Sequence, residues 1–196
     1  MIKNLKSQIS IFNLNKGYTL VELLAVTSII VVISGLIVGI LYSTLRGGNK
    51  TKVTNDVSQN GNYAMSVIAN TILSAQAVTQ VNGIPITDCT VPPEGVSGKS
   101  IQFEEANGNL ITYACDSNSI ASSSGTTTND LIDISAVKVD PNSCTFTCFQ
   151  HNANPYSLPI IKVVFTVSQQ SSGSIVENAA TSTFNTSVAM RNYNPR

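Results

Sequence analysis

A single uncharged stretch near the N-terminus constrains this chain more than any other feature. From Leu23 to Leu45, 23 consecutive residues carry no charge, and most of them are apolar. As a helix this stretch is about 34 Å long, whereas the hydrocarbon core of a bilayer is about 30 Å thick. The rest of the 196-residue chain is rich in Ser, Thr and Asn, as a soluble domain is. The sequence therefore predicts a single membrane pass followed by one medium-sized domain.

The N-terminal segment does not have the form of an ordinary secretory signal, in which a short apolar core precedes a small-residue cleavage site. The apolar core here is too long, and LYSTLRGGNK at its end has no A-x-A-like pattern. Charge asymmetry does not decide the orientation. Three basic residues lie before the run and three after it: Lys3, Lys6 and Lys16, then Arg46, Lys50 and Lys52. The cysteines and the short N-terminal side favour a domain outside the cytoplasmic membrane.

The residues just before the apolar run form a specific pattern. KGYTLVELL, residues 16–24, follows a short basic leader and places Gly17 before Tyr18 and Glu22 close behind. A carboxylate in lipid costs about 2.5–3.5 kcal/mol at the middle of a spanning helix and less near its end, so Glu22 needs a reason. The pattern resembles the cleavage and methylation motif of type IV prepilins, which pilins, minor pilins and type II secretion pseudopilins share. Tyr18 departs mildly from it, since phenylalanine is commoner there.

This resemblance implies that a prepilin peptidase removes the leader, residues 1–17, by cutting between Gly17 and Tyr18, and that Tyr18 is then N-methylated. Glu22 would lie one helical turn from the cationic amine of Tyr18, where the helix dipole favours an anion. Two roles stay open. Glu22 neutralises its own amine, or it pairs with the amine of a neighbouring subunit and sets the assembly register. In an assembled filament we expect the second.

Two glycines interrupt the apolar run. Gly35 and Gly39 form a G-x-x-x-G pair, a spacing that lets helices approach closely in lipid. The resemblance also implies a point in this part of the stem that loosens during assembly, and Gly39 is the candidate for it.

The helical pattern continues beyond the membrane segment. In residues 55–78 apolar side chains recur mostly every three or four residues, as in an amphipathic helix: Val57, Met65, Ile68, Ile72 and Leu73. We expect one helix from about residue 18 to 78, with 18–45 as the transmembrane and assembly segment and 46–79 as the amphipathic outer half. The alternative is a simple anchor and a separate core helix that part at Gly47-Gly48.

Residues 80–196 are predicted to form a β-rich globular head. SIQFEEANGNLITYAC predicts a hairpin that turns at Asn107-Gly108. LIDISAVKVDPNSCTFTCF predicts one or two strands broken at 140–142, PIIKVVFTVS a central strand, and TSTFNTSVAMRN the last strand. Residues 117–130, SNSIASSSGTTTND, predict a mobile loop. The expected fold class is α+β, with a long N-terminal helix packed against an antiparallel sheet.

All four cysteines lie in the head: Cys89, Cys115, Cys144 and Cys148. An even number outside a membrane anchor predicts two disulfides, with three pairings to choose from; the spacing is poor for zinc, the rival interpretation. In a straight strand the Cα atoms of 144 and 148 would lie about 13 Å apart, beyond the roughly 7 Å that a bridge tolerates. A local Cys144–Cys148 bond therefore requires a turn or bulge; otherwise both cysteines pair across to Cys89 and Cys115. We expect the local bond, with Cys89–Cys115 as the other.

No catalytic constellation is visible, so we expect that the protein is not an enzyme. The single histidine, His151, lies in a polar segment, and Glu104 and Glu105 would point to opposite faces of a strand. We expect no cofactor; five aspartates whose spacing fits no recognisable loop are the candidates for structural calcium: Asp88, Asp116, Asp130, Asp133 and Asp140. Without the leader the chain holds 8 Lys+Arg and 11 Asp+Glu, a net charge of −3, which gives no reason to expect strong nucleic-acid binding.

Together these features predict a structural subunit of a type IV pilus or a type II secretion-like pseudopilus. It would be held in the cytoplasmic membrane with its head outside and would assemble with other pilin or pseudopilin subunits through its stem helix. The ending TSVAMRNY weakly resembles minor pilins and minor pseudopilins. Cell adhesion, DNA uptake and protein secretion all use such subunits. The alternative is a membrane-anchored extracellular binding or adhesin domain on an uncleaved anchor.

Overall fold

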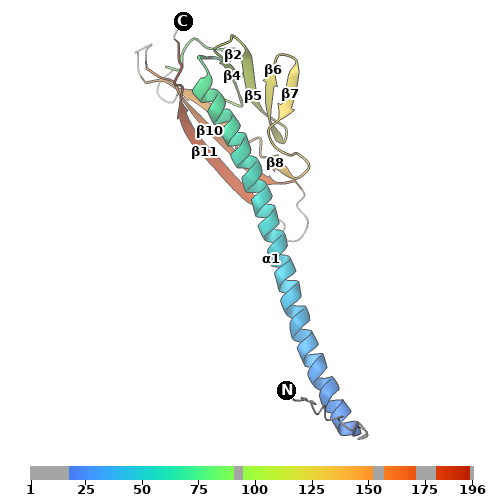
Figure 1. Cartoon of the computed structure of the whole chain (residues 1–196). Helices are drawn as coiled ribbons and strands as arrows, with labels where there is room; N and C mark the ends of the chain where they lie inside the picture. Colours follow the sequence, from blue (N-terminus) through green and yellow to red (C-terminus); the bar gives the residue numbers. More distant parts are fainter. Residues whose placement is uncertain (1–17, 91–94, 152–156, 171–179, 195–196) are drawn as a thin grey trace, which may run out of the picture. The chain divides into compact units, whose positions relative to one another are not determined.

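One long helix precedes all of the strands (Figure 1). The computed structural model describes residues 18–90, 95–151, 157–170 and 180–194, and the chain divides into two compact units, 1–45 and 46–196. Helix α1 (Leu20–Ser74) is continuous through Gly47 and Gly48, so the alternative with two separate helices is not observed. The predicted α+β class is confirmed, because the helix is combined with antiparallel sheets.

Helix α1 ends four residues before the predicted boundary. Its last residue is Ser74, and strand β1 (Ala77–Val81) starts almost at once. The Gln76 N–H donates to the carbonyl of Glu104 at 2.8 Å, so the backbone here joins a sheet. The helix has neither a glycine nor a basic residue in its last turn. Pairing with the sheet therefore determines where the helix ends.

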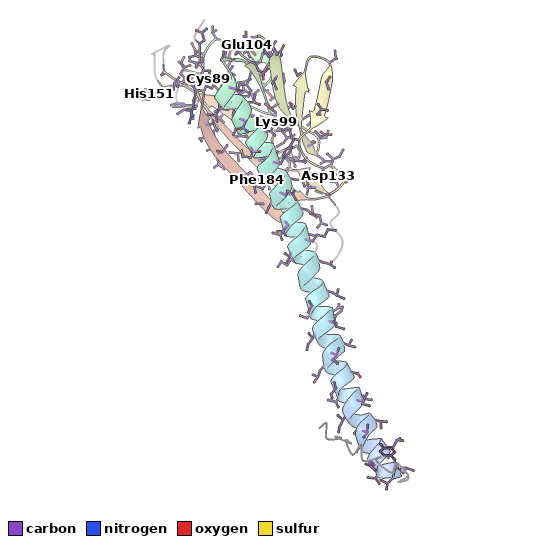
Figure 2. All side chains as sticks on the ribbon, viewed as in Figure 1. Cys89, Lys99, Glu104, Asp133, His151 and Phe184 are labelled. Carbon is purple, nitrogen blue, oxygen red and sulfur yellow. A yellow bond between two sulfur atoms is a disulfide. The ribbon has the colours of Figure 1, made fainter. Side chains whose placement is uncertain are left out.

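The outer half of α1 turns one face to the core. Five residues at three- to four-residue intervals are buried: Val57, Gly61, Ala64, Ile68 and Ile72. Val57, Ile68 and Ile72 were expected there, whereas Met65 and Leu73 are only half-buried. The two small residues were not expected. At Gly61 a Cβ atom would collide with the ring of Phe184, which lies beside α1 (Figure 2).

The first sheet has six antiparallel strands in the order β2-β1-β4-β5-β6-β7. Besides β1, its strands are β2 (Ile84–Pro85), β4 (Ser100–Glu104), β5 (Leu110–Asp116), β6 (Ser119–Ser124) and β7 (Thr127–Asp130). The predicted hairpin is confirmed as β4–β5. Its turn contains Gly108 at φ 81°, whose N–H donates to the Glu105 carbonyl at 2.9 Å.

The prediction of a mobile loop over residues 117–130 is wrong. These residues form the β6–β7 hairpin, which turns at Gly125 with φ 60°. Ile120 and Ala121 are buried, while β7 is exposed along its whole length. A strand at the edge of a sheet needs few apolar side chains, so a run of Ser and Thr, the latter β-branched, is compatible with it.

The second sheet has the order β11-β10-β9-β3, with β8 also paired to β10. Its strands are β3 (Val96–Gly98), β8 (Val137–Val139), β9 (Thr145–Phe149), β10 (Ile160–Gln169) and β11 (Thr181–Ala189). The break at 140–142, the central β10 and the final strand are confirmed. The described part of the head therefore contains two sheets where the sequence predicted one.

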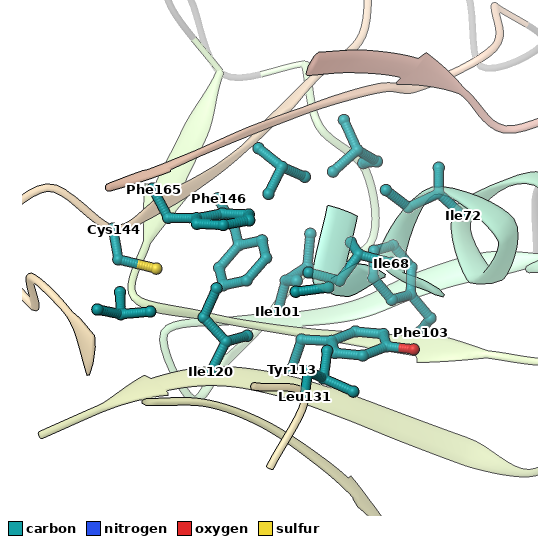
Figure 3. Packing of buried hydrophobic residues seen from close by; sticks show 14 of the residues in the cluster. Ile68, Ile72, Ile101, Phe103, Tyr113, Ile120, Leu131, Cys144, Phe146 and Phe165 are labelled. Carbon is teal, nitrogen blue, oxygen red and sulfur yellow. The ribbon is translucent and has the colours of Figure 1, made fainter. Parts of the chain in front are cut away.

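One core joins α1 to both sheets. In Figure 3, Ile68 and Ile72 of the helix face Phe103 and Tyr113 of the first sheet and Phe146 of the second. The Tyr113 hydroxyl and Thr71 Oγ1 share a hydrogen bond of 2.7 Å. The outer half of α1 is thus part of the head's folded interior.

The predicted disulfide pairing is wrong. The bonds are Cys89–Cys148 and Cys115–Cys144, with Cα–Cα distances of 5.5 and 6.1 Å. Residues 145–149 form strand β9, so the turn that a local bond requires is absent. Because alternate strand residues share a face, Cys144 and Cys148 both point into the core and pair across to the other two cysteines. Cys115–Cys144 links β5 of the first sheet to the start of β9 in the second.

Candidate functional site

The start of α1 has a local cap. Thr19 precedes the helix, and the Glu22 N–H donates to its Oγ1 at 3.3 Å and to its carbonyl at 3.0 Å. Thr19 and Glu22 have the spacing of a capping box, in which an acidic or amide residue occupies the third helical position. Glu22 also lies in the first turn, where the helix dipole favours an anion. Sequence reasoning missed this cap, although T-x-x-E was the signal for it.

Glu22 is exposed, and no ion pair to it occurs among the residues that the structure describes. Gly17 and the rest of the leader lie outside the described residues, so the proposed cleavage site is described only from Tyr18 onward. Tyr18 is 74% exposed. The proposed cut would therefore fall next to an accessible residue that lies two positions before the first residue of the helix.

The segment from Tyr18 to Lys52 buries no residue within the chain. Large apolar side chains project from all sides of its helical part (Figure 2). By length and composition α1 can cross a membrane. An apolar surface of this extent on a soluble protein marks a membrane or protein contact, so this segment requires lipid or other helices around it.

Several hydroxyls in this segment donate to backbone carbonyls of the helix itself. Thr27 Oγ1 donates to the Leu23 carbonyl at 3.0 Å, and Ser28 Oγ to the Ala25 carbonyl at 2.8 Å. Thr44 Oγ1 donates to the Ile40 carbonyl at 2.9 Å. Because an unpaired donor in hydrocarbon costs several kcal/mol, roughly, these bonds make the polar residues compatible with lipid.

Gly35 and Gly39 lie on one face of the intact helix. With Ser43 they line a shallow hollow of about 430 Å³. A Cβ atom at either glycine would meet nothing within 4 Å, so neither glycine is required by packing inside this chain. Helix α1 is continuous through Gly39 in the single subunit; the roles of the pair in assembly stay predictions.

The five aspartates considered for calcium do not come together. Among the described residues no three His, Cys, Asp or Glu side chains are placed to hold a metal ion. Most of them cap local turns instead. The Thr90 hydroxyl donates to Asp88 at 2.6 Å and lowers the pKa of that carboxyl, and the Ser135 hydroxyl does the same for Asp133.

A small cavity in the described part of the head lies beside Glu104, a buried acid. It measures about 210 Å³ and is lined by residues including Thr79, Glu104 and Tyr193. Among the described residues its lining contains no histidine, cysteine or serine. His151 is exposed at the edge of the described region.

Searches of protein-family models, of curated proteins and of solved structures found no match to this chain. Its function is therefore inferred from the N-terminal motif and from the exposed helix.

Proposed function

We propose that this chain is a structural subunit of a type IV pilus or a pseudopilus-like filament, cut between Gly17 and Tyr18. The observation that carries this proposal is the sequence KGYTLVELL placed directly at the start of an exposed apolar helix. Removing the leader takes away Lys3, Lys6 and Lys16 and leaves the apolar segment in place. Cleavage thereby turns a membrane precursor into a subunit whose helix can pack beside others.

The exposed helix suits both stages of such a life cycle. Lipid covers it before assembly, and neighbouring helices cover it in the filament. Its apolar side chains and internally bonded hydroxyls fit either surrounding. The outer half of α1 belongs to the head's core, so a subunit carries its head on the same helix that it contributes to assembly.

Glu22 has two candidate roles, one within its own helix and one between neighbouring subunits. At the third helical position of a capping box it stabilises the first turn of its own helix. As an exposed carboxylate without an ion pair in the described chain, it is also available to the methylated amine of a neighbour's Tyr18. An unpaired charge in lipid is unfavourable for both partners, so we favour the intermolecular pair in the filament.

The proposal is tested by the mature N-terminus. In cells that process prepilins, we expect the wild-type protein to begin at an N-methylated Tyr18 by N-terminal sequencing and intact mass. Gly17→Val should leave the full precursor uncut, because a branched side chain obstructs the peptidase at the cut. Asn15→Val places the same branched side chain two residues earlier and should be processed normally. A mature mass that Gly17→Val leaves unchanged refutes the proposed cleavage.

One observation favours a second candidate, a membrane-anchored binding domain with an uncleaved anchor. Thr19 and Glu22 have the spacing of a capping box, and the helix dipole favours an acid in the first turn, which together account for Glu22 without any free amine. In that case the native protein retains residues 1–17, and the same sequencing experiment identifies it.

A further inference from the structure

Among the described strands of the head, two have an open edge long enough to pair with another chain. The outermost strands of the two sheets are β2 and β7, and β11 and β3. Of these, β2 has two residues and β3 has three, whereas β7 has four and β11 has nine. In Figure 1, β11 and β7 lie on opposite flanks of the head.

The hydrogen-bond register shows which backbone groups of β11 point outward. The Gln169 N–H donates to the Ala180 carbonyl, and the Met190 N–H donates to the Pro159 carbonyl. In an antiparallel pair such bonds recur at every second residue, so the even-numbered residues of β11 face β10. The N–H and C=O groups of the odd-numbered residues therefore point away from the sheet: Thr181, Thr183, Asn185, Ser187 and Ala189. Among the described residues these groups have no partner.

The same reasoning applies to β7. The Leu131 N–H donates to the Ile120 carbonyl at 2.8 Å, so the odd-numbered residues face β6. The backbone groups of Thr128 and Asp130 point outward, and no hydrogen bond to them occurs in the described parts of the chain.

Strand β11 lacks the features that usually protect an edge. Proteins block edges with charged residues, proline, bulges or very short strands. Residues 181–189 contain no charge and no proline, and the register with β10 runs through all nine pairs without a bulge. Such an edge is suited to receive a further strand.

The two edges run in opposite directions relative to α1. Gly61 lies against Phe184, and the Asn194 N–H bonds the Gln76 carbonyl, so β11 runs along α1. Glu104 and Leu110 pair beside Gln76, at the end of α1. Strand β5 starts there and runs antiparallel to α1. Because β6 is antiparallel to β5 and β7 is antiparallel to β6, β7 has the same direction as β5. Strand β7 leads to Asp133, whose N–H donates to Asn60 Oδ1 of α1 at 2.8 Å. Strand β7 is therefore antiparallel to both α1 and β11.

We propose that the β11 edge of one copy pairs with the β7 edge of a second copy as adjacent antiparallel strands. The inference rests on the proposed function for one point, that the stems of neighbouring copies are parallel. Parallel stems make the two edges antiparallel, whereas two like edges, β11 with β11, can pair antiparallel only if one stem is inverted. The contact uses different surfaces on the two copies, so it can repeat from one copy to the next, as a filament requires.

The pairing is small and depends on stem packing for its strength. Thr128 and Asp130 together offer at most about four N–H···O=C bonds to the facing strand. Stems that share a membrane or filament hold the heads at a high effective concentration, so a weak contact becomes populated. Paired in this way, the heads set the order of neighbours along the filament.

Site-specific crosslinking in membranes tests the pairing with the full-length protein. Two differently tagged copies are coexpressed, one with Asn185→Cys and the other with Thr128→Cys, and a short bismaleimide is added. We expect a mixed dimer that contains both tags. The matched control replaces Asn185→Cys by Lys162→Cys, which is exposed on the neighbouring strand β10 but not at its edge, and should lose the dimer.

A second pair of variants tests the backbone directly. Ser187→Pro removes an N–H that faces the open edge and leaves the ladder to β10 intact, so it should abolish the 185–128 crosslink. Ser187→Thr retains that N–H and should leave the crosslink unchanged. Normal disulfide mapping of each variant verifies that the head is folded.

Three results overturn the pairing: a mixed dimer no stronger than that of the Lys162→Cys control, a crosslink that survives Ser187→Pro, or 185–185 dimers in its place. The N-terminus of the same samples is sequenced in parallel. A chain that begins at Tyr18 without the crosslink refutes this inference alone. A crosslink on a chain that keeps its leader refutes the proposed processing alone.

Discussion

Replacing Gly61 with alanine sets two effects in α1 against each other. Alanine favours a helix over glycine by about 0.8–1.0 kcal/mol, and Gly61 lies well inside the helix. The added Cβ, however, collides with the ring of Phe184, which is itself stacked on Phe165 at a centroid distance of 5.4 Å. Overpacking of this kind costs about 1–3 kcal/mol. The net expectation is a loss of about 0–2 kcal/mol in the free energy of unfolding.

The effect of Gly61→Ala on the free energy of unfolding should change sign when the Phe184 ring is removed. In a Phe184→Ala background the collision is absent, so Gly61→Ala should stabilise the head by about 1 kcal/mol. The two substitutions should therefore be coupled by about 1–3 kcal/mol. Gly48→Ala is the matched control, since a Cβ there meets nothing within 4 Å; it should be neutral or stabilising.

Thermal and denaturant unfolding of the full-length protein in mild detergent measures this coupling. For a head of this size 1 kcal/mol corresponds to about 2–4 °C in Tm. If Gly61→Ala raises Tm equally with and without Phe184, the helix does not pack on β11 as described, and the reasoning fails.

Three further outcomes are expected. Glu22→Gln keeps a residue that supports the capping box but removes the negative charge. Incorporation into filaments should therefore fall, while insertion into the membrane persists. If incorporation is normal, the charge of Glu22 is not needed for assembly and capping the helix is its remaining role. Tyr113→Phe removes the 2.7 Å bond to Thr71 and should cost about 0.5–1.5 kcal/mol. Burial raises the pKa of Tyr113 above 10.0, so its contribution is complete below that pH and is lost as pH rises through the folded-state pKa; denaturant midpoints above pH 10 should fall more for wild type than for the variant. Replacing Cys115 and Cys144 by serine opens a bridge of sequence separation 29 and should cost on the order of 3–4 kcal/mol, and non-reducing peptide mapping of wild type should join Cys115 to Cys144.

The elements that could be predicted from sequence are those with strong local signals. The apolar run defined the first part of α1, Asn107-Gly108 marked the β4–β5 turn, and the apolar stretch around Val163 identified β10 as central. At the proposed site, the spacing of Gly17 and Glu22 directed attention to the start of the helix.

The features that were missed depend on contacts between distant parts of the chain. Gly61 is buried because Phe184 packs on it, and nothing near Gly61 in the sequence records that contact. The partner of Cys144 depends on β9 lying within reach of β5, which spacing along the chain does not reveal. Strands β6 and β7 lie at the edge of the first sheet and are held there by backbone hydrogen bonds. They were not predicted because their sequence has no apolar pattern typical of a strand.

The bond between Cys89 and Cys148 has a mechanical consequence. It joins residues 59 positions apart, and the Cys115–Cys144 bond lies within that span. A tensile load that enters through the helix and leaves near the C-terminus crosses from one cysteine to the other without straightening the residues between them. Residues 89–148 are thus excluded from extension, and a thread built of such units lengthens only where the chain lies outside this covalent loop.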